Sequence, residues 1–85
     1  MAEYRITIKP SAAKELARLS SAVASRVEAK IARLASDARP AGVKKLKDAE
    51  LWRIRIGDWR VIYSIDDRKA IVDIIYIRHR SQAYE

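Results

Sequence analysis

The chain has 85 residues, and its 18 Lys and Arg outnumber 11 Asp and Glu, which gives a formal net charge of +7. A chain of this length is expected to form one domain, residues 1–85, with one modest core. The absence of cysteine excludes disulfides and thiolate metal sites, and we expect a cytoplasmic protein. No apolar run resembles a signal peptide or reaches the roughly 20 residues that cross a membrane, so no membrane association is expected.

The first half of the chain predicts a strand and two helices. Residues 4–9 alternate large and polar side chains, as strands do, and Pro10 ends this run. Ser11 can cap a first helix, and Ser20 or Ser21 can cap a second. The second helix is predicted to continue to Arg39-Pro40 and to carry an apolar stripe on one side. The stripe consists of Val23, Val27, Ile31 and Leu34.

The second half predicts three strands at residues 51–56, 59–65 and 70–77, which are rich in aromatic and β-branched residues. Gly57-Asp58 has the pattern of a type II′ hairpin turn, and residues 66–69 form a second polar turn. The expected fold is therefore α+β, with a helical hairpin on one face of an antiparallel meander. Residues 43–47 are compatible with a short strand or a loop. The third strand is expected to place apolar side chains on both faces, which favours a protein partner over the uncovered face.

A two-residue turn also fixes which residues face each other. It places Arg55 opposite Arg60, so that Arg53, Arg55 and Arg60 share one face of the sheet. Like charges placed opposite each other destabilise a sheet, and guanidinium pairs bind phosphate well. These arginines indicate an anion site, or alternatively the solvated side of an amphipathic hairpin.

The end of the chain adds Arg78-His79-Arg80 and Tyr84. Histidine can transfer protons near neutral pH, and tyrosine can stack on a base or relay a proton. Whether Arg78 or His79 faces Arg60 depends on the length of the second turn, which the sequence leaves open. With one histidine and no grouped carboxylates, neither a metal site nor a cofactor is expected.

The run from Leu51 to Tyr63, followed by His79-Arg80 and Tyr84, resembles the RelE family of bacterial and archaeal toxins. The resemblance covers essentially the whole chain. It implies the toxin of a type II toxin–antitoxin system, a metal-independent endoribonuclease that cleaves mRNA on the ribosome and inhibits translation. The motif is shared across the RelE/ParE superfamily, so a ParE-type DNA gyrase inhibitor and a non-catalytic antitoxin-binding member remain alternatives.

The resemblance also implies roles for individual residues. Arg60 and Arg78 would contact the scissile phosphate, Tyr84 would stack on the substrate base, and His79 is the candidate for proton transfer with Tyr84 as runner-up. Substrate contacts are expected from Arg53, Arg55, Arg80, Lys45 and Lys47.

Two of these residues depart from the family pattern. Arg53 and Arg55 stand where the best-known member has lysines, and an arginine cannot readily accept a proton at pH 7. The implied partners are a cognate antitoxin and the ribosome with mRNA in its decoding site. DNA would be contacted only indirectly, through the antitoxin complex.

Overall fold

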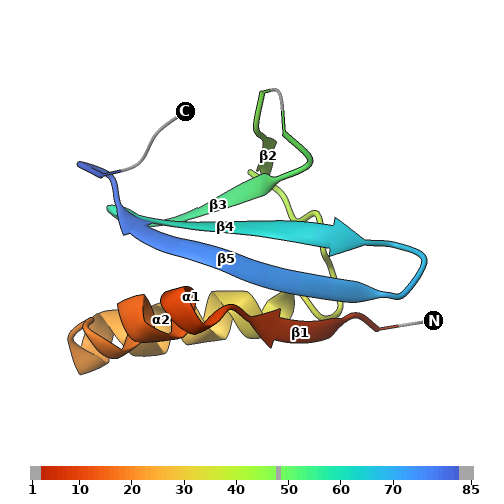
Figure 1. Ribbon diagram of the computed structural model, residues 1–85. Coiled ribbons are helices and arrows are strands. Elements are labelled where there is room, and N and C mark those ends of the chain that lie inside the picture. The colour runs from red at the N-terminus through yellow and green to blue at the C-terminus, as the bar shows by residue number, and fades with distance from the viewer. Residues whose placement is uncertain (1–2, 48, 83–85) are drawn as a thin grey trace.

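The computed structural model describes residues 3–47 and 49–82, which form a mixed sheet with two helices on one face (Figure 1). The strand order is β1-β5-β4-β3-β2; β1 runs parallel to β5, and the other neighbouring pairs are antiparallel. This architecture confirms the expected α+β fold. The elements are β1 (Arg5–Ile8), α1 (Pro10–Ala17), α2 (Ser21–Arg33), β2 (Lys44–Lys45), β3 (Trp52–Ile56), β4 (Trp59–Asp66) and β5 (Ile71–His79).

The helix starts follow the sequence only in part. The expected cap at Ser11 is wrong, because α1 already begins at Pro10 and has Lys9 at its N-cap. Proline is suited to the first helical position, where its fixed φ fits and its missing N–H is not needed. The cap of α2 is confirmed: the Ser20 hydroxyl accepts a hydrogen bond from the Val23 backbone N–H at 3.3 Å.

The second helix ends at Arg33, well before the predicted stop at Arg39-Pro40. Tertiary hydrogen bonds explain the early end. The Ala35 carbonyl accepts from the Tyr4 backbone N–H, and the Ala38 carbonyl accepts from the Tyr63 hydroxyl, each at 2.8 Å. Both carbonyls are thereby used to fix the chain against the sheet.

The apolar stripe predicted for α2 packs on the sheet. Val27, Ile31 and Leu34 are each at most 5% exposed, whereas Val23 lies partly buried at the edge of the core. Ala12 is the buried residue of α1. The strands contribute the side chains of Ile54, Ile56, Val61, Tyr63, Val72, Ile74 and Ile77.

The segment that follows α2 is anchored by Arg39. Its guanidinium donates two hydrogen bonds to the Asp67 carboxylate, at 2.9 and 3.3 Å, and lies 4.9 Å from the centre of the Trp52 ring. The Tyr4 hydroxyl donates to the same carboxylate. These hydrogen bonds, from Arg39 first and then from Tyr4, lower the pKa of Asp67. We call Arg39, Asp67, Tyr4 and Trp52 the Arg39 anchor.

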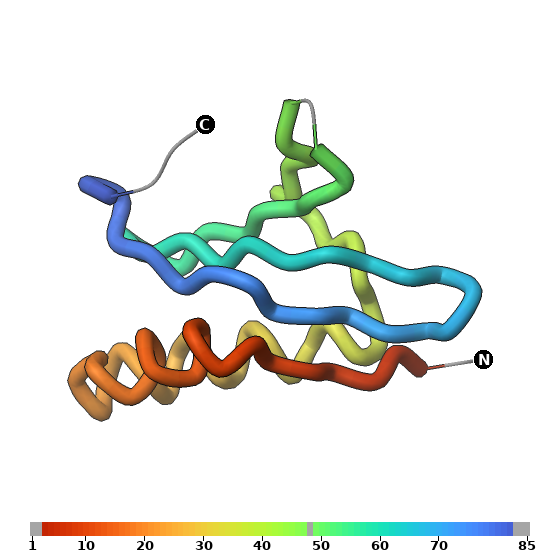
Figure 2. The backbone as a smooth tube through the Cα atoms, viewed as in Figure 1, coloured from red at the N-terminus to blue at the C-terminus, as the bar shows by residue number. Residues whose placement is uncertain are grey.

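The β3–β4 hairpin has the predicted register, with Ile56 opposite Trp59 and Arg55 opposite Arg60. Gly57 has φ +59°, the left-handed conformation that a type II′ turn requires at its first central position. The tube in Figure 2 follows the chain through this hairpin into the longer β4–β5 hairpin, and shows β2 on the side of the sheet away from the helices.

The β4–β5 hairpin contains a β-bulge. Tyr63 pairs with Ile74 and Ile62 pairs with Tyr76, so Ile75 is an extra residue on β5. Because of the bulge, Val72, Ile74 and Ile77 all reach the core. Ile71 precedes Val72 in a regular part of the ladder, so it faces the other side, where it is half-buried; Ile75 at the bulge is half-buried too. The strand thus places apolar side chains on both faces, as expected.

Residues 43–47 contain the two-residue strand β2, which pairs with the start of β3. Neither described helix is long and apolar enough to cross a membrane.

Candidate functional site

Three arginines stand in a row across the face of the sheet opposite the helices. Arg60 of β4 lies opposite Arg55 of β3 on one side and opposite Arg78 of β5 on the other. Directly opposed residues point to the same face of a sheet, and Arg53, two residues before Arg55, shares that face. We call Arg53, Arg55, Arg60 and Arg78 the arginine face. The structure thus brings Arg78 to the group that the sequence predicted.

Arg60 is the centre of this row. The residue is only 8% exposed, and neither its Nε nor its Nη1 has a hydrogen-bond partner within the described chain. A buried donor without a partner costs roughly 1–3 kcal/mol, and more when it is charged. Arg55 and Arg78 flank it with further positive charge. This combination favours the binding of an anion that supplies the missing acceptors.

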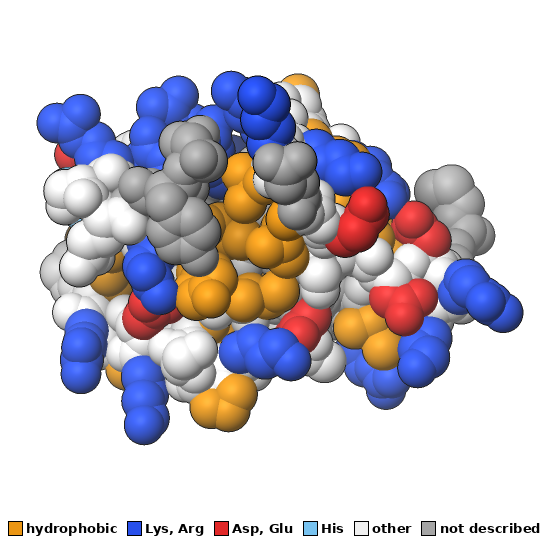
Figure 3. Space-filling view, turned by 45° about the horizontal axis from the view of Figure 1, so that its top comes forward, with side chains coloured by type: hydrophobic (Ala, Val, Ile, Leu, Met, Phe, Trp, Pro, Cys, Tyr) orange, Lys and Arg blue, Asp and Glu red, His pale blue; other side chains and the backbone are white. Residues whose placement is uncertain are grey.

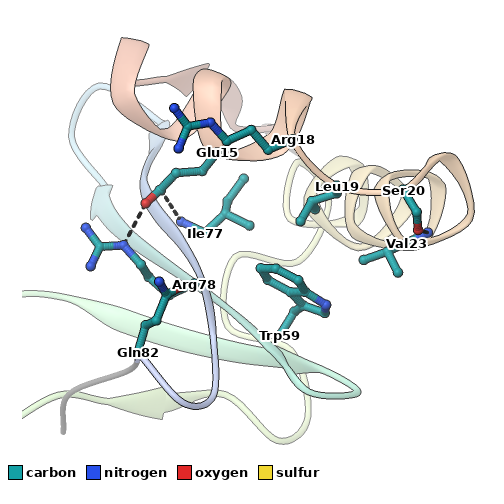
Figure 4. A pocket seen from close by; sticks show the side chains of 9 residues that line it. All are labelled: Glu15, Arg18, Leu19, Ser20, Val23, Trp59, Ile77, Arg78 and Gln82. Carbon is teal, nitrogen blue, oxygen red and sulfur yellow. Dashed lines mark hydrogen bonds and ion pairs between the residues drawn. The ribbon is translucent and has the colours of Figure 1, made fainter.

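Arg78 is held in place by α1. Its Nε donates to Glu15 Oε2 at 2.6 Å, and the other carboxylate oxygen of Glu15 accepts from the Ile77 backbone N–H at 2.8 Å (Figure 4). The guanidinium also lies 4.5 Å from the centre of the Tyr76 ring. The hydrogen bond to Glu15 uses Nε, and the two terminal nitrogens are further donors that a ligand can engage.

The position of Glu15 follows from the sheet topology. β1 pairs with β5 only from Ile71 to Ile74, so the later part of that edge is left to α1. Glu15 satisfies a backbone donor of this edge and orients a guanidinium at the same time. A cavity of about 380 Å³ lies beside it, between the helical hairpin and the ends of β4 and β5, and Trp59 and Gln82 are among its lining residues.

His79 lies on the other face of the sheet. It pairs with Trp59, whose ring it meets edge-on with 5.2 Å between the ring centres. The Ser81 backbone N–H donates to His79 Nδ1 at 3.2 Å, and the Ser81 hydroxyl lies 3.0 Å from the same nitrogen. Because Nδ1 accepts, a neutral ring carries its proton on Nε2. The register separates this imidazole from the arginine face.

The other residues predicted to contact substrate are not members of the arginine face. Arg80 is placed 3.6 Å from the Asp58 carboxylate, and Lys45 is 3.6 Å from Glu50 and 5.7 Å from the centre of the Trp52 ring. Lys47 is exposed in the loop after β2. Tyr84 lies outside the described residues.

Three residues beside the site were not identified from the sequence. Lys44 lies opposite Arg53 and so adds a cation to the same face, whereas the predicted Lys45 lies opposite Trp52. Glu15 and Tyr76 position Arg78. The strand pattern could have suggested Tyr76 only if the bulge had been known.

The space-filling view in Figure 3 brings the side of the sheet opposite the helices forward. Lys and Arg side chains gather along its upper part, next to an apolar area near the centre of the view. Among residues 3–47 and 49–82, no group of three or more His, Asp or Glu could hold a metal ion.

Comparison with known proteins identifies the family. Residues 6–84 match the model of the ParE toxin of the type II toxin–antitoxin system parDE. Toxin RelE of Mycobacterium tuberculosis is 37% identical over 83 residues, covering 95% of this chain and 86% of the relative. The chain belongs to the RelE/ParE family of type II toxins.

Two solved structures of RelE proteins have the same fold. The archaeal RelE–RelB complex from Pyrococcus horikoshii superposes with a TM-score of 0.84 at 30% identity, covering 95% of this chain and 99% of the other. The RelBE2 complex of M. tuberculosis gives a TM-score of 0.82 at 25% identity, covering 92% and 99%. The resemblance to RelE toxins is therefore confirmed, while the matching family model is named for the ParE branch.

Proposed function

We propose that this toxin is a metal-independent endoribonuclease that cleaves mRNA in the decoding site of the ribosome and so inhibits translation in the cytoplasm. The observation that carries the proposal is Arg60, which is buried, lacks partners for two of its donors and stands between two other arginines. A phosphodiester that gains negative charge during the reaction fits this site better than a neutral ligand.

The proposed reaction is attack of a ribose 2′-oxygen on the adjacent phosphorus. The new O–P bond forms as the bond to the 5′-oxygen of the next nucleotide breaks, which leaves a 2′,3′-cyclic phosphate and a 5′-hydroxyl. The 2′-hydroxyl gives up its proton, and the leaving 5′-oxygen takes one up. Arg60 and Arg78 would stabilise the charge on the phosphate, with Arg55 as a further contact, because preorganised donors act most strongly where charge develops.

Proton transfer requires a base for the 2′-hydroxyl and an acid for the leaving 5′-oxygen. A guanidinium carries only donors and no acceptor, so the arginine face does not supply the base. His79 faces Trp59 on the helix side, so its register argues against direct contact with a phosphate at Arg60. Tyr84, the other proposed group, is then favoured. A limited acid–base set would make the isolated protein a weak nuclease, with the ribosome supplying the orientation of the mRNA.

A cognate antitoxin is the second proposed partner. The structurally similar proteins from P. horikoshii and M. tuberculosis were both solved as toxin–antitoxin complexes. We infer that this chain is neutralised in the same general way, and that it meets DNA only through such a complex.

Inhibition of DNA gyrase is a competing function, and the family model named for ParE specifically favours it. A chain that keeps only antitoxin binding is a further alternative, because Arg53 and Arg55 replace the lysines of the best-known RelE.

Brief induction in cells, followed by mapping of mRNA 5′ ends, separates these functions. The mapping is repeated on a purified transcript with and without ribosomes. Cuts at codon positions that need ribosomes would support the nuclease. Arg68→Ala, which removes an exposed arginine from the turn before β5, is a control variant that should cut mRNA as the wild type does. Growth arrest with intact mRNA would instead support gyrase, and intact mRNA without arrest would support a partner-binding role alone.

A further inference from the structure

A second group of cations lies outside the arginine face, where α2 runs along the edge of β3. β2 pairs only with Trp52 and Arg53, so the rest of this edge has no described strand beside it. Two cavities of about 620 and 410 Å³ open there. Lys30, Arg33 and Arg55 line both of them, and Arg26 lines the second. We call Arg26, Lys30, Arg33 and Arg55 the basic groove.

The charges of the basic groove are not neutralised within the described chain. Elsewhere Lys9, Arg39, Lys45, Arg78 and Arg80 each lie within 4.0 Å of a carboxylate, but among residues 3–47 and 49–82 no such pair involves a groove cation. The acidic residue among the lining side chains is Asp37, whose carboxylate accepts from the Arg39 backbone N–H.

The three cations of α2 are spaced to form a continuous line. Arg26, Lys30 and Arg33 occupy successive turns of the helix, where neighbouring side chains are about 5–6 Å apart. The guanidinium of Arg26 lies over the β3–β4 turn, since its Nη2 would be 3.3 Å from a Cβ placed on Gly57. The line therefore runs from the end of the hairpin toward the end of α2.

We propose that the basic groove binds the phosphodiester backbone of RNA as an extension of the arginine face. This inference rests on the proposed nuclease function. Arg55 connects the two regions, because it lies opposite Arg60 on the sheet and also lines the groove. An RNA strand whose phosphate is held at Arg60 can then continue over the edge of β3 and along α2.

The lining favours RNA over an amphipathic helix of a protein partner. Its large apolar side chains, Leu34, Ile54 and Ile56, are each at most 5% exposed, and the more accessible apolar lining residues, Ala29, Pro40 and Ala41, are small, so the groove offers little area for hydrophobic contact. No aromatic ring lines either cavity, so base stacking is not provided by the described residues. Charged groups without stacking or apolar contact recognise the backbone independently of sequence.

The test uses the triple variant Arg26→Gln/Lys30→Gln/Arg33→Gln, in which all three positions are exposed and glutamine is a good helix former. Arg55 stays, so the arginine face is unchanged. Binding to a labelled 2′-O-methyl oligoribonucleotide, which cannot be cleaved, is measured against salt concentration. Loss of three phosphate contacts should reduce the slope of log affinity against log salt by about 2.

The matched control, Arg5→Gln/Lys14→Gln/Arg68→Gln, removes the same charge from exposed positions away from the groove and should keep the wild-type slope. Cosedimentation with ribosomes forms a second arm. A reduced slope with the oligonucleotide identifies single-stranded RNA as the ligand, and a loss confined to ribosomes identifies ribosomal RNA. Either result supports the proposal.

Equal slopes for the groove and control variants with both probes would overturn the proposal, as would an absence of wild-type binding to both. It would also be overturned if the groove variant lost affinity only for the antitoxin. The binding experiment does not depend on cleavage, which is measured separately. If Arg60→Met removed cleavage while the groove variant bound RNA normally, the groove inference would fail and the proposed nuclease function would stand. If the groove bound RNA but the wild-type protein did not cleave it, the groove inference would stand and the proposed nuclease function would fail.

Discussion

Arg39 and Arg60 show two opposite uses of a guanidinium in the same small fold. Arg39 is 42% exposed, yet it has two hydrogen bonds to Asp67 and lies over Trp52. Arg60 is 8% exposed and has no partner for two of its donors among the described residues. The exposed charge is satisfied and the buried one is not. The difference suggests that the Arg39 anchor serves stability, while the arginine face gives up stability for ligand binding.

The largest expected effect comes from two single variants, in which Arg60 or Arg39 is replaced by methionine, an uncharged side chain of similar length. Arg60→Met should reduce ribosome-dependent mRNA cleavage by about 10²–10³-fold, as expected when a preorganised donor to a developing charge is removed. It should leave the free energy of unfolding unchanged or raise it, since a buried charge without partners is lost. Arg39→Met should lower the thermal midpoint of unfolding, whereas its mRNA cleavage should stay at the wild-type level. Equal loss of activity in both variants would contradict this division.

A smaller loss of activity is expected from the residue that positions Arg78. Glu15→Gln keeps an oxygen for the Ile77 backbone N–H but no longer attracts the Arg78 guanidinium. Cleavage should fall about tenfold, mainly in kcat, because the phosphate contact is misplaced. Single-turnover cleavage on ribosomes at saturating toxin separates kcat from binding. Glu28→Gln, an exposed position on α2, is the matched control. A purely structural role would lower stability without changing kcat.

The two candidates for proton transfer should then differ. Tyr84→Phe is expected to reduce the cleavage rate more than His79→Gln, because His79 lies on the face opposite Arg60 and is already hydrogen-bonded to Ser81. The comparison is made from pH 5 to 9 on programmed ribosomes. A larger loss in His79→Gln would show that the imidazole reaches the substrate after all.

The smallest expected effect concerns a residue of the core. Burial, the largest cause, raises the pKa of Tyr63 from 10.0 to about 12. Folding therefore holds this proton more tightly, and its contribution to stability is complete below pH 10 and lost as the pH rises to about 12. Tyr63→Phe should cost about 1 kcal/mol at neutral pH through the lost bond to Ala38 and should flatten this alkaline decline. Chemical denaturation at several pH values measures both changes; an unchanged slope would assign the decline to another group.

Local rules explain why much of this fold could be predicted. The Gly57-Asp58 turn determined the pairing of Arg55 with Arg60, and the Ser20 cap determined the start of α2. Features set by distant contacts could not be predicted in this way. The end of α2 depends on two carbonyls that accept hydrogen bonds from Tyr4, which lies many residues before the helix, and from Tyr63, which lies many residues after it.

The candidate site shows the same limit. The row of arginines on β3 and β4 followed from one short turn, but the membership of Arg78 required the β4–β5 register. The contact between Glu15 and Arg78 joins residues from opposite ends of the chain. Its only trace in the sequence is a glutamate on a short helix, which has no distinguishing pattern.

The bulge at Ile75 decides which side chain of β5 lies beside Arg60. If the ladder instead continued regularly through Ile75 from the Tyr63–Ile74 pair, Arg60 would face Ile77, and Arg78 would face Trp59 on the helix side. The extra residue shifts the register by one and so brings a guanidinium, in place of an apolar side chain, to the arginine face. A slip of one residue in this hairpin would therefore remove Arg78 from the site without changing any amino acid.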